Sequence, residues 1–327
     1  MFASVAPDPF RSANGDTLAR APSRGEAARD RLFRGLARVA TWSIVLVMVA
    51  ILVEIGGNAL PAIDRFGLGF LAGTTWDANG GDFGILPMIW GTLYSAFLAL
   101  VLGGVFGVTI ALFLTQSFLP PTLELVFRNI VELLAAIPSV IYGLWGIYVV
   151  IPALRPVAEV LHGQFDWFPL FSTSLSGPGM LPAALVLAIM ILPTVAAISQ
   201  DALRAVPGKV IEAVYGMGAT RWEAIIRVIV PTAGKSIFGA LVLGLGRALG
   251  ETMALAMLVG NSNQVSLSLF SPANTLAALL ALNFPEAGDL EVEALMYAAV
   301  VLLLITLLVN LLGAAIVSRA NRQAVEM

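Results

Sequence analysis

The sequence predicts an all-α, polytopic membrane protein with six transmembrane helices. Apolar residues make up 58% of its 327 residues and charged residues only 12%, with a mean hydropathy of +0.90. In soluble domains about a quarter of the residues are charged. Six apolar stretches approach or exceed the roughly 20 residues that a helix needs to cross a bilayer. Lys and Arg are concentrated in alternate connecting segments, which by the positive-inside rule places both termini in the cytoplasm.

The six predicted spans follow one another with polar segments between them. They comprise residues 36–55, 85–115, 128–150, 180–199, 236–260 and 292–317. The segments predicted as loops on the outer side are residues 56–84, 152–179 and 261–291. With this topology, all of the 18 Lys and Arg except Arg65, Arg155 and Arg247 lie on the cytoplasmic side.

The predicted domain organisation is simple. Residues 1–34 are polar, rich in Arg, Ala, Ser and Pro, and lack a signal-peptide core, so they predict a mobile cytoplasmic tail. Residues 35–327 form one transmembrane domain. In the second span, Gly103 and Gly107 predict close helix packing. In the third span, Pro138 predicts a kink that faces the helix bundle or a pathway.

The polar segment 201–235 predicts two short helices joined by a glycine turn. Pro207 suits a first helical position, so a helix should run through Glu212 and Ala213 to Tyr215. Glycines at 216 and 218 should then end it, and Gly218 sits where a turn needs a positive φ. The result is a rigid cytoplasmic segment between the fourth and fifth spans.

The second helix of this segment has its own start signal. Thr220 followed by Glu223 predicts a capping box, in which each side chain satisfies a backbone donor of the other residue. This helix should end at Pro231. An amphipathic cytoplasmic loop of any membrane protein is the alternative interpretation of the segment.

The spacing of the segment resembles the EAA loop of ABC importer permeases. Its landmarks are Glu212-Ala213-Val214, Gly218 four residues later, and Val228-x-Val230-Pro231 after nine more. In that family the motif is Glu-Ala-Ala, three residues, Gly, nine residues and Ile-x-Leu-Pro. The resemblance implies an ABC importer permease fold of the type I, MetI-like kind, and a loop that docks on a cytoplasmic ATPase dimer through Glu212, Ala213, Gly218, Val228 and Pro231.

Several kinds of chemistry are excluded by the residue types. The chain has no Cys and a single histidine, His162, so thiolate and histidine-cluster metal sites are excluded. Residues 233–236 resemble the end of a phosphate-binding P-loop, but Ile229 occupies the position of its first glycine. We therefore predict a non-catalytic subunit without a cofactor of its own, with ATP bound by a partner.

The predicted fifth span contains charges near the middle of the membrane. Arg247 lies about 17 Å from the predicted start of this span, at 1.5 Å per residue, where a charge must face protein or water. Glu251, one turn later, should share its helix face and neutralise it. One interpretation is a structural ion pair that locks helices together, packed closely at Gly246 and Gly250. The other is a guanidinium fork for an anion such as phosphate. Glu132 is a weaker candidate for the same network.

Several motifs together resemble one branch of the importer permeases. In order they are GDFGILPMIWGTL, ELLAAIPSVIYGLWG, ILPTVAAISQDALRAVP and GLGRALGETMA. Over roughly residues 80–260 they resemble the PstC-like permeases of phosphate ABC importers. The resemblance implies a PstA-like permease subunit, an ATPase dimer, an extracytoplasmic phosphate-binding protein and membrane lipid as partners, and no nucleic acid. The PstA-like branch usually has Arg-Ala-Ile-Gly-Glu-Thr-Ala-Pro, so Met253 and Ala254 favour PstC.

Other functions remain open at this point. The chain could be the PstA-like sister subunit, or a permease for another oxyanion. A secondary transporter could use Glu251 as a proton site, although the EAA-like loop argues against it. A membrane signalling scaffold would show no turnover that depends on a substrate.

Overall fold

The computed structural model describes residues 24–116 and 118–323. The chain divides into two compact units, residues 1–54 and 55–327. Helix α1 (Arg24–Phe66) contributes to both units, and within it Arg34 pairs with Asp30 one turn away. Residues 24–34, predicted as part of a tail, are therefore helical, whereas residues 1–23 of that predicted tail lie outside the described residues.

Within the described residues, six helices are long and apolar enough to cross a membrane, as predicted. They are α1, α3 (Leu86–Thr115), the helix Ser139–Phe165, α7 (Met180–Arg204), the helix Arg221–Leu249, and α13 (Asp289–Gln323). The number of spans is thus confirmed, whereas several bounds differ from the prediction. The bounds differ where a proline interrupts a predicted span and where a helix continues beyond its predicted end.

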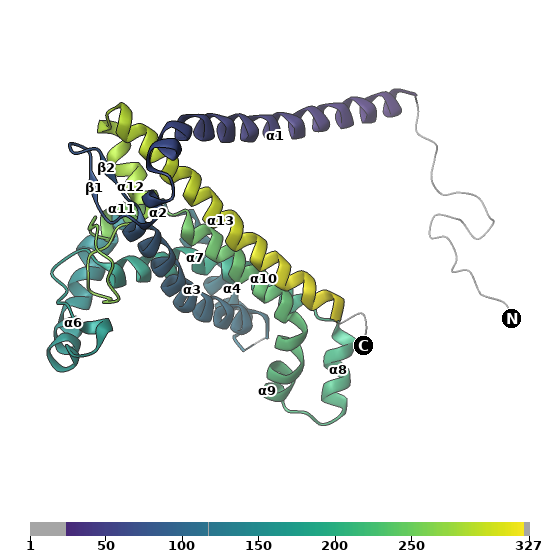
Figure 1. Ribbon diagram of the computed structural model, residues 1–327. Helices are drawn as coiled ribbons and strands as arrows, with labels where there is room; N and C mark the ends of the chain where they lie inside the picture. The colour runs from purple at the N-terminus through teal and green to yellow at the C-terminus, as the bar shows by residue number, and fades with distance from the viewer. Residues whose placement is uncertain (1–23, 117, 324–327) are drawn as a thin grey trace. The chain divides into compact units, whose positions relative to one another are not determined.

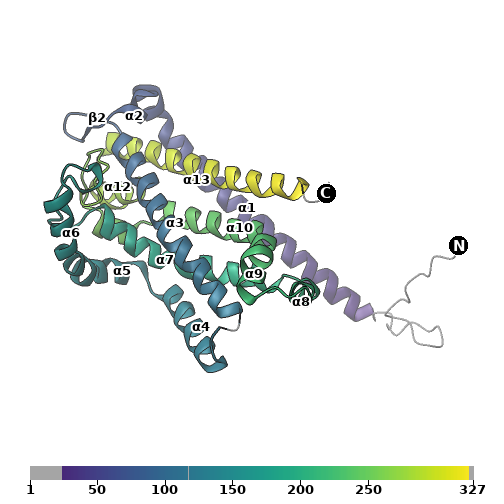
Figure 2. The same ribbon diagram turned by 90° about the horizontal axis from the view of Figure 1, so that it is seen from below.

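The core of the second unit is the packing of α3 on α7 (Figure 2). A Cβ at Gly103 would lie 2.6 Å from the Ala188 carbonyl oxygen, and one at Gly107 would lie 3.0 Å from the Val195 side chain. The predicted close packing at these two glycines is confirmed. Helix α10 (Val230–Leu249) lies against both α7 and α3, and α13 lies along α10.

The predicted third span, residues 128–150, is wrong, because the chain breaks at Pro138. Helix α4 (Pro121–Ala136) ends before it, and α5 (Ser139–Trp145) begins after it. Pro138 has φ −60° and ψ 143°, an extended conformation outside both helices, rather than the predicted kink within one helix. The Tyr142 hydroxyl donates a hydrogen bond to the Leu134 carbonyl at 2.8 Å. This bond joins the two helices across the break and satisfies one of the unpaired carbonyls of the last turn of α4.

Two π-helical turns carry the chain into helices that contain proline. Turn η1 (Gly146–Val150) joins α5 to α6 (Ile151–Phe165), just before Pro152. Turn η3 (Ile225–Ile229) joins α9 (Arg221–Ala224) to α10, just before Pro231. A proline within an α-helix clashes with the carbonyl four residues earlier, and the wider π turn changes that spacing. The prediction that the second helix of the loop ends at Pro231 is therefore wrong.

The segments predicted as outer loops contain more helix than expected. Helix α1 continues past Pro61, and α6 continues to Phe165, followed by the 3-10 turn η2 (Pro169–Phe171). A short helix α2 (Gly69–Ala72) leads to a hairpin of β1 (Trp76–Asp77) and β2 (Asp82–Phe83), in which Trp76 pairs with Phe83. The third segment contains α12 (Leu276–Asn283) and the 3-10 turn η4 (Phe284–Glu286).

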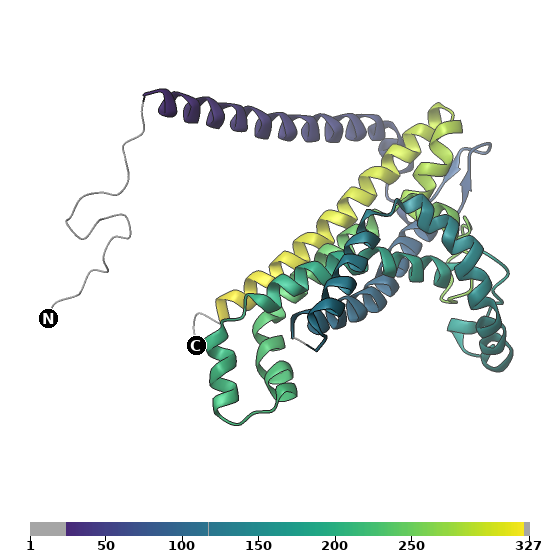
Figure 3. The same ribbon diagram turned by 180° about the vertical axis from the view of Figure 1, so that it is seen from behind.

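The connecting segments gather at two opposite ends of the second unit. The β1–β2 hairpin, α6 and α12 lie at one end, and α8 (Gly208–Gly216) and α9 lie at the other (Figures 1 and 3). At the first end, Phe70 stacks on Tyr297 with ring centroids 4.5 Å apart, and the Trp76 indole N–H donates to Glu291 at 2.9 Å. The segments predicted on the outer side and the segment predicted in the cytoplasm thus lie at opposite ends of the helices.

Candidate functional site

The predicted helix–glycine–helix of segment 201–235 is confirmed. Helix α8 ends at Gly216, and Gly218 has a φ of +85° in the turn that follows. Pro207, predicted as the first helical residue, instead occupies the position before the helix, with ψ 131°. The capping box is present: the Thr220 N–H donates to the Glu223 carboxylate at 2.9 Å, and the Glu223 N–H donates to the Thr220 hydroxyl at 3.4 Å.

This hairpin of α8 and α9 presents an exposed tip on a buried base. Glu212, Ala213 and Gly218 are exposed, and Met217 beside them is 80% exposed. At the base, Ile225 and Ile229 are buried in a cluster with α3 and α7 side chains. Of the other two predicted docking residues, Val228 is half-buried and Pro231 is exposed. The hairpin is therefore firmly attached to the helix bundle while its tip is free to contact a partner.

A second anchor of the hairpin involves the connection between α3 and α4. The Arg221 guanidinium lies 4.0 Å from the centre of the Phe118 ring, and the Trp222 ring lies 5.2 Å from it. A cation over an aromatic face is attractive. Sequence analysis missed this contact, because Phe118 is distant in the chain and no spacing links it to Arg221.

Arg247 lies in the last turn of α10 and is exposed on the surface of the chain. Its Nη1 donates to the Thr194 hydroxyl on α7 at 3.2 Å. Thr194 was not predicted, although a hydroxyl directly after Pro193 in an apolar span is the signal that could have identified it. The guanidinium is thus attached at one nitrogen and open on its other side.

Glu251 does not pair with Arg247, contrary to the prediction. Helix α10 ends at Leu249, so Glu251 lies beyond the helix rather than one turn further along the same face. Its carboxylate accepts a hydrogen bond from the Ala254 N–H at 3.4 Å, at the start of α11 (Met253–Leu258). A carboxylate is favourable at a helix N-terminus. Among the described residues no ion pair links Arg247 to an acidic side chain.

Glu132 lies apart from this site. It is exposed on α4, and within the described part of the chain no ion pair or hydrogen bond joins it to Arg247. Its membership of the same network as Arg247 is not supported by a direct contact and stays a prediction. Of the two glycines beside Arg247, Gly246 faces Asn310 of α13, whose amide oxygen is 3.1 Å from where its Cβ would be, and Gly250 has no close neighbour.

Two helix breaks occur close to Arg247. Helices α5 and α11 pack side by side: Gly143 lies against Met257 and Ala254, and Gly146 lies against Leu258. The beginning of the helix Ser139–Phe165 therefore lies beside α11, the segment that follows the end of α10. Tyr142, in its first turn, donates to the Leu134 carbonyl on the other side of the Pro138 break. A helix start presents unpaired N–H groups and the positive end of its dipole, so this region is favourable for an anion.

Comparison with known proteins identifies the family. Residues 103–322 match the model of the binding-protein-dependent transport system inner membrane component family. The chain belongs to this family. It is similar to the phosphate transport system permease proteins PstC of Mesorhizobium japonicum (37% identity, 86% of this chain and 88% of that protein) and Haemophilus influenzae (38%, 90% and 94%). It is also similar to the probable phosphate transport system permease protein PstC of Methanocaldococcus jannaschii (33% identity, 86% of this chain and 91% of that protein).

Solved structures show that this inner membrane component has the ABC importer permease fold. A chain of the bacterial alginate ABC transporter superposes with a TM-score of 0.59 at 16% identity, covering 89% of this chain and 98% of that one. A chain of the inward-facing MetNI methionine ABC transporter gives 0.54 at 20% identity, covering 72% and 95%. The predicted permease fold is therefore confirmed, in a multi-pass inner membrane protein.

The family region includes both parts of the candidate site. The α8–α9 hairpin and Arg247 each lie inside residues 103–322. In this permease they are joined by one continuous helix, Arg221–Leu249, made of α9, η3 and α10. At about 1.5 Å per residue, Arg247 lies about 39 Å from Arg221 along that helix.

Proposed function

We propose that this permease provides the path by which phosphate crosses the inner membrane in an ATP-driven importer. The observation that supports it best is the continuous helix Arg221–Leu249, which has the exposed hairpin at one end and Arg247 at the other. Force applied to the hairpin by a partner moves this helix and, with it, the arginine. Alternating access then follows from ATP hydrolysis on the partner chains.

Phosphate is the proposed substrate for two reasons. The relatives named above are phosphate permeases, and the free side of the Arg247 guanidinium is suited to a tetrahedral oxyanion. Arginine donates two parallel hydrogen bonds to such an anion, and it keeps its charge at all physiological pH values. Thr194 holds one nitrogen of the fork at 3.2 Å, which limits its motion. Glu251, which caps α11, is assigned a supporting role at the edge of the path, and Glu132 only a remote one.

The exposure of Arg247 supports a two-subunit path. A charged side chain in the membrane must face protein or water rather than lipid. On this chain Arg247 is exposed and surrounded by apolar helices. A PstA-like permease subunit placed against this face encloses the arginine, so that the path runs between the two subunits.

The other partners are assigned to the two ends of the permease. A cytoplasmic ATPase dimer docks on the α8–α9 hairpin through Glu212, Ala213, Gly218, Val228 and Pro231. An extracytoplasmic phosphate-binding protein docks at the opposite end, where the β hairpin, α6 and α12 lie. This assignment puts both termini in the cytoplasm, in agreement with the distribution of Lys and Arg.

Reconstitution tests the proposal directly. The permease is placed in proteoliposomes with a PstA-like subunit, the ATPase and the binding protein, and ATP hydrolysis is measured with phosphate, sulfate or molybdate. We expect stimulation by phosphate alone. Equal stimulation by sulfate or molybdate would contradict the assigned substrate. Phosphate uptake that persists without the ATPase would instead indicate a secondary transporter.

A further inference from the structure

An apolar cavity lies between α3, α4 and α7, and Arg247 is not among the residues that line it. Its volume is about 340 Å³, and its walls include Thr109 and Phe113 of α3, Ile130 and Leu134 of α4, and Leu192 of α7. The Thr109 hydroxyl donates to the Val105 carbonyl at 2.7 Å within its own helix, so Thr109 presents its methyl group as wall. The cavity begins at Leu119, in the connection between α3 and α4, and follows α4 as far as Leu134. Ile130 is 45% exposed, so the cavity opens to the side of the bundle.

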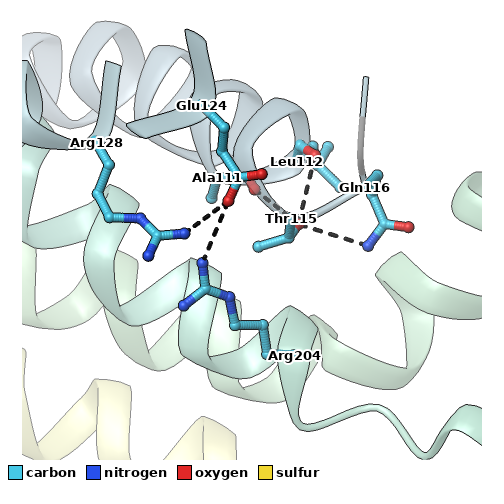
Figure 4. A network of polar contacts seen from close by, with 7 residues as sticks. All are labelled: Ala111, Leu112, Thr115, Gln116, Glu124, Arg128 and Arg204. Atoms are coloured by element: carbon cyan, nitrogen blue, oxygen red, sulfur yellow. Dashed lines mark hydrogen bonds and ion pairs between the residues drawn. The ribbon is translucent and has the colours of Figure 1, made fainter. Parts of the chain in front are cut away.

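A cluster of two arginines and one glutamate lies beside the same stretch of α4. The Arg128 guanidinium donates to Glu124 at 2.7 Å, and Arg204 of α7 approaches the same carboxylate oxygen at 4.0 Å (Figure 4). One carboxylate therefore serves two guanidinium groups, and the cluster keeps a positive charge. The Arg128 Nε is buried and has no hydrogen-bond partner, and the Arg204 side chain is 45% exposed. The two guanidinium groups therefore offer an anion N–H donors that Glu124 does not use, together with a net positive charge.

The cluster and the cavity form one continuous surface. Residues three and four apart share a helix face, so Glu124, Arg128 and the cavity-lining Val131 follow one another along α4. This end of the helices is also the end that carries the α8–α9 hairpin, because Phe118 contacts both Arg221 and Trp222. An apolar cavity therefore extends toward the centre of the membrane from a basic cluster at the hairpin end.

We propose that this surface binds one anionic phospholipid, with an acyl chain in the cavity and its headgroup phosphate on Arg128 and Arg204. Basic pockets between transmembrane helices on the cytoplasmic side are suited to anionic headgroups. The acyl chain removes apolar walls from water, and the phosphate supplies the acceptors that Glu124 alone does not. The lipid thereby connects α4 to the end of α7, directly beside the coupling hairpin.

Lipid retention by the purified permease tests the site. The full chain is incorporated into bilayers of equal phosphatidylglycerol and phosphatidylcholine, extracted gently, and its bound lipids are counted by native mass spectrometry. We expect one retained phosphatidylglycerol. Arg128→Gln and Arg204→Gln should each reduce the preference for phosphatidylglycerol about fivefold, the change that about 1 kcal/mol per basic residue gives. Unchanged preference in the double variant would overturn the proposal.

Matched controls separate this site from general attraction to acidic lipid. Arg227→Gln removes an arginine that also has a glutamate one turn before it, Glu223 at 3.9 Å, but that does not lie on the α4 face beside this cavity. This variant should retain the lipid. Ile130→Trp fills the cavity and should displace it, whereas Val126→Trp, at an equally exposed position of α4 outside the cavity, should not. Loss of lipid in all five single variants, or in neither tryptophan variant, would refute the assignment.

Two further arms distinguish other occupants. Excess inorganic phosphate should not release the lipid, since the acyl chain holds it; release would identify the cluster as a site for the free anion. The same count is made on the permease in complex with a PstA-like subunit. Retention of phosphatidylglycerol in this complex would support the proposed lipid site, whereas loss of the lipid would show that the partner subunit covers the cavity.

Discussion

Arg247 is the residue on which substrate recognition depends in our proposal. Its guanidinium is planar, permanently charged, and held on one side by Thr194. An ammonium group at the same place keeps the charge but offers no flat pair of donors. Transport should therefore depend on the planar geometry of the guanidinium and not on its charge alone.

The Arg247→Lys variant separates these two properties. Loss of one charge-assisted hydrogen bond costs about 1.5–3 kcal/mol, so phosphate uptake per assembled complex should fall at least about tenfold. Assembly should persist, because the charge and the surrounding helices are unchanged. Uptake is measured in proteoliposomes and normalised to purified complex. Transport near the wild-type rate would rule out the bidentate role.

Glu251 allows a test of the rejected ion pair. Since its carboxylate caps α11, Glu251→Gln should lower the free energy of unfolding by about 1 kcal/mol or less. The coupling energy with Arg247→Gln should be below about 0.5 kcal/mol, as expected for residues that share no contact. All four proteins of the cycle are compared by denaturation in the same detergent. Coupling well above about 1 kcal/mol would restore the structural pair.

At the scale of the secondary-structure elements, the turn between α8 and α9 depends most on one residue, Gly218. Its φ of +85° is accessible to glycine, whereas a residue with a Cβ is strained there by about 1–2 kcal/mol. No atom lies within 4 Å of a Cβ built at either Gly218 or Gly216. The two positions therefore differ in backbone conformation and not in available space.

This difference provides a controlled test of the coupling hairpin. Gly218→Leu should distort the turn, so that the ATPase co-purifies poorly or hydrolyses ATP without phosphate uptake. Gly216→Leu, at the end of α8 with an ordinary φ, should affect coupling much less. ATPase retention and uptake are measured for both. Full uptake by Gly218→Leu would contradict the role of the hairpin as a lever.

The helical hairpin was predictable because its signals are local: the Thr220–Glu223 capping box and Gly218 act within a few residues. The breaks at Pro138 and after Leu249 were not, because a proline such as Pro138 or a glycine such as Gly250 permits either a continued helix or a break, and packing decides between them. The contacts of Arg247 could not be predicted for the same reason. Its helix and charge were evident in the sequence, but its partner Thr194 lies on another helix, and Glu251 was misplaced by assuming that α10 continued.

At the scale of the whole molecule, the predicted membrane orientation can be tested because the connecting segments of the second unit lie at two opposite ends. The chain has no Cys, so single cysteines report accessibility without background. Cysteines at the exposed positions Ser172 and Gln264 should react with an impermeant thiol reagent added to sealed cells, and one at Ser318 should not. Reaction is detected by mass shift of the purified permease. Labelling of Ser318 from outside would overturn the six-span orientation.

The π turn at Ile225–Ile229 has a consequence for how length is encoded in this permease. A π turn is equivalent to one residue inserted into an α-helix, and each residue turns an α-helix by about 100°. The wider turn absorbs that residue, so the helix beyond it keeps nearly the rotational phase of an uninterrupted α-helix that is one residue shorter. Deleting one residue from this turn should therefore leave Arg247 facing Thr194, whereas inserting one residue into the regular part of α10 would turn the arginine toward a different neighbour although every side chain of the site remained.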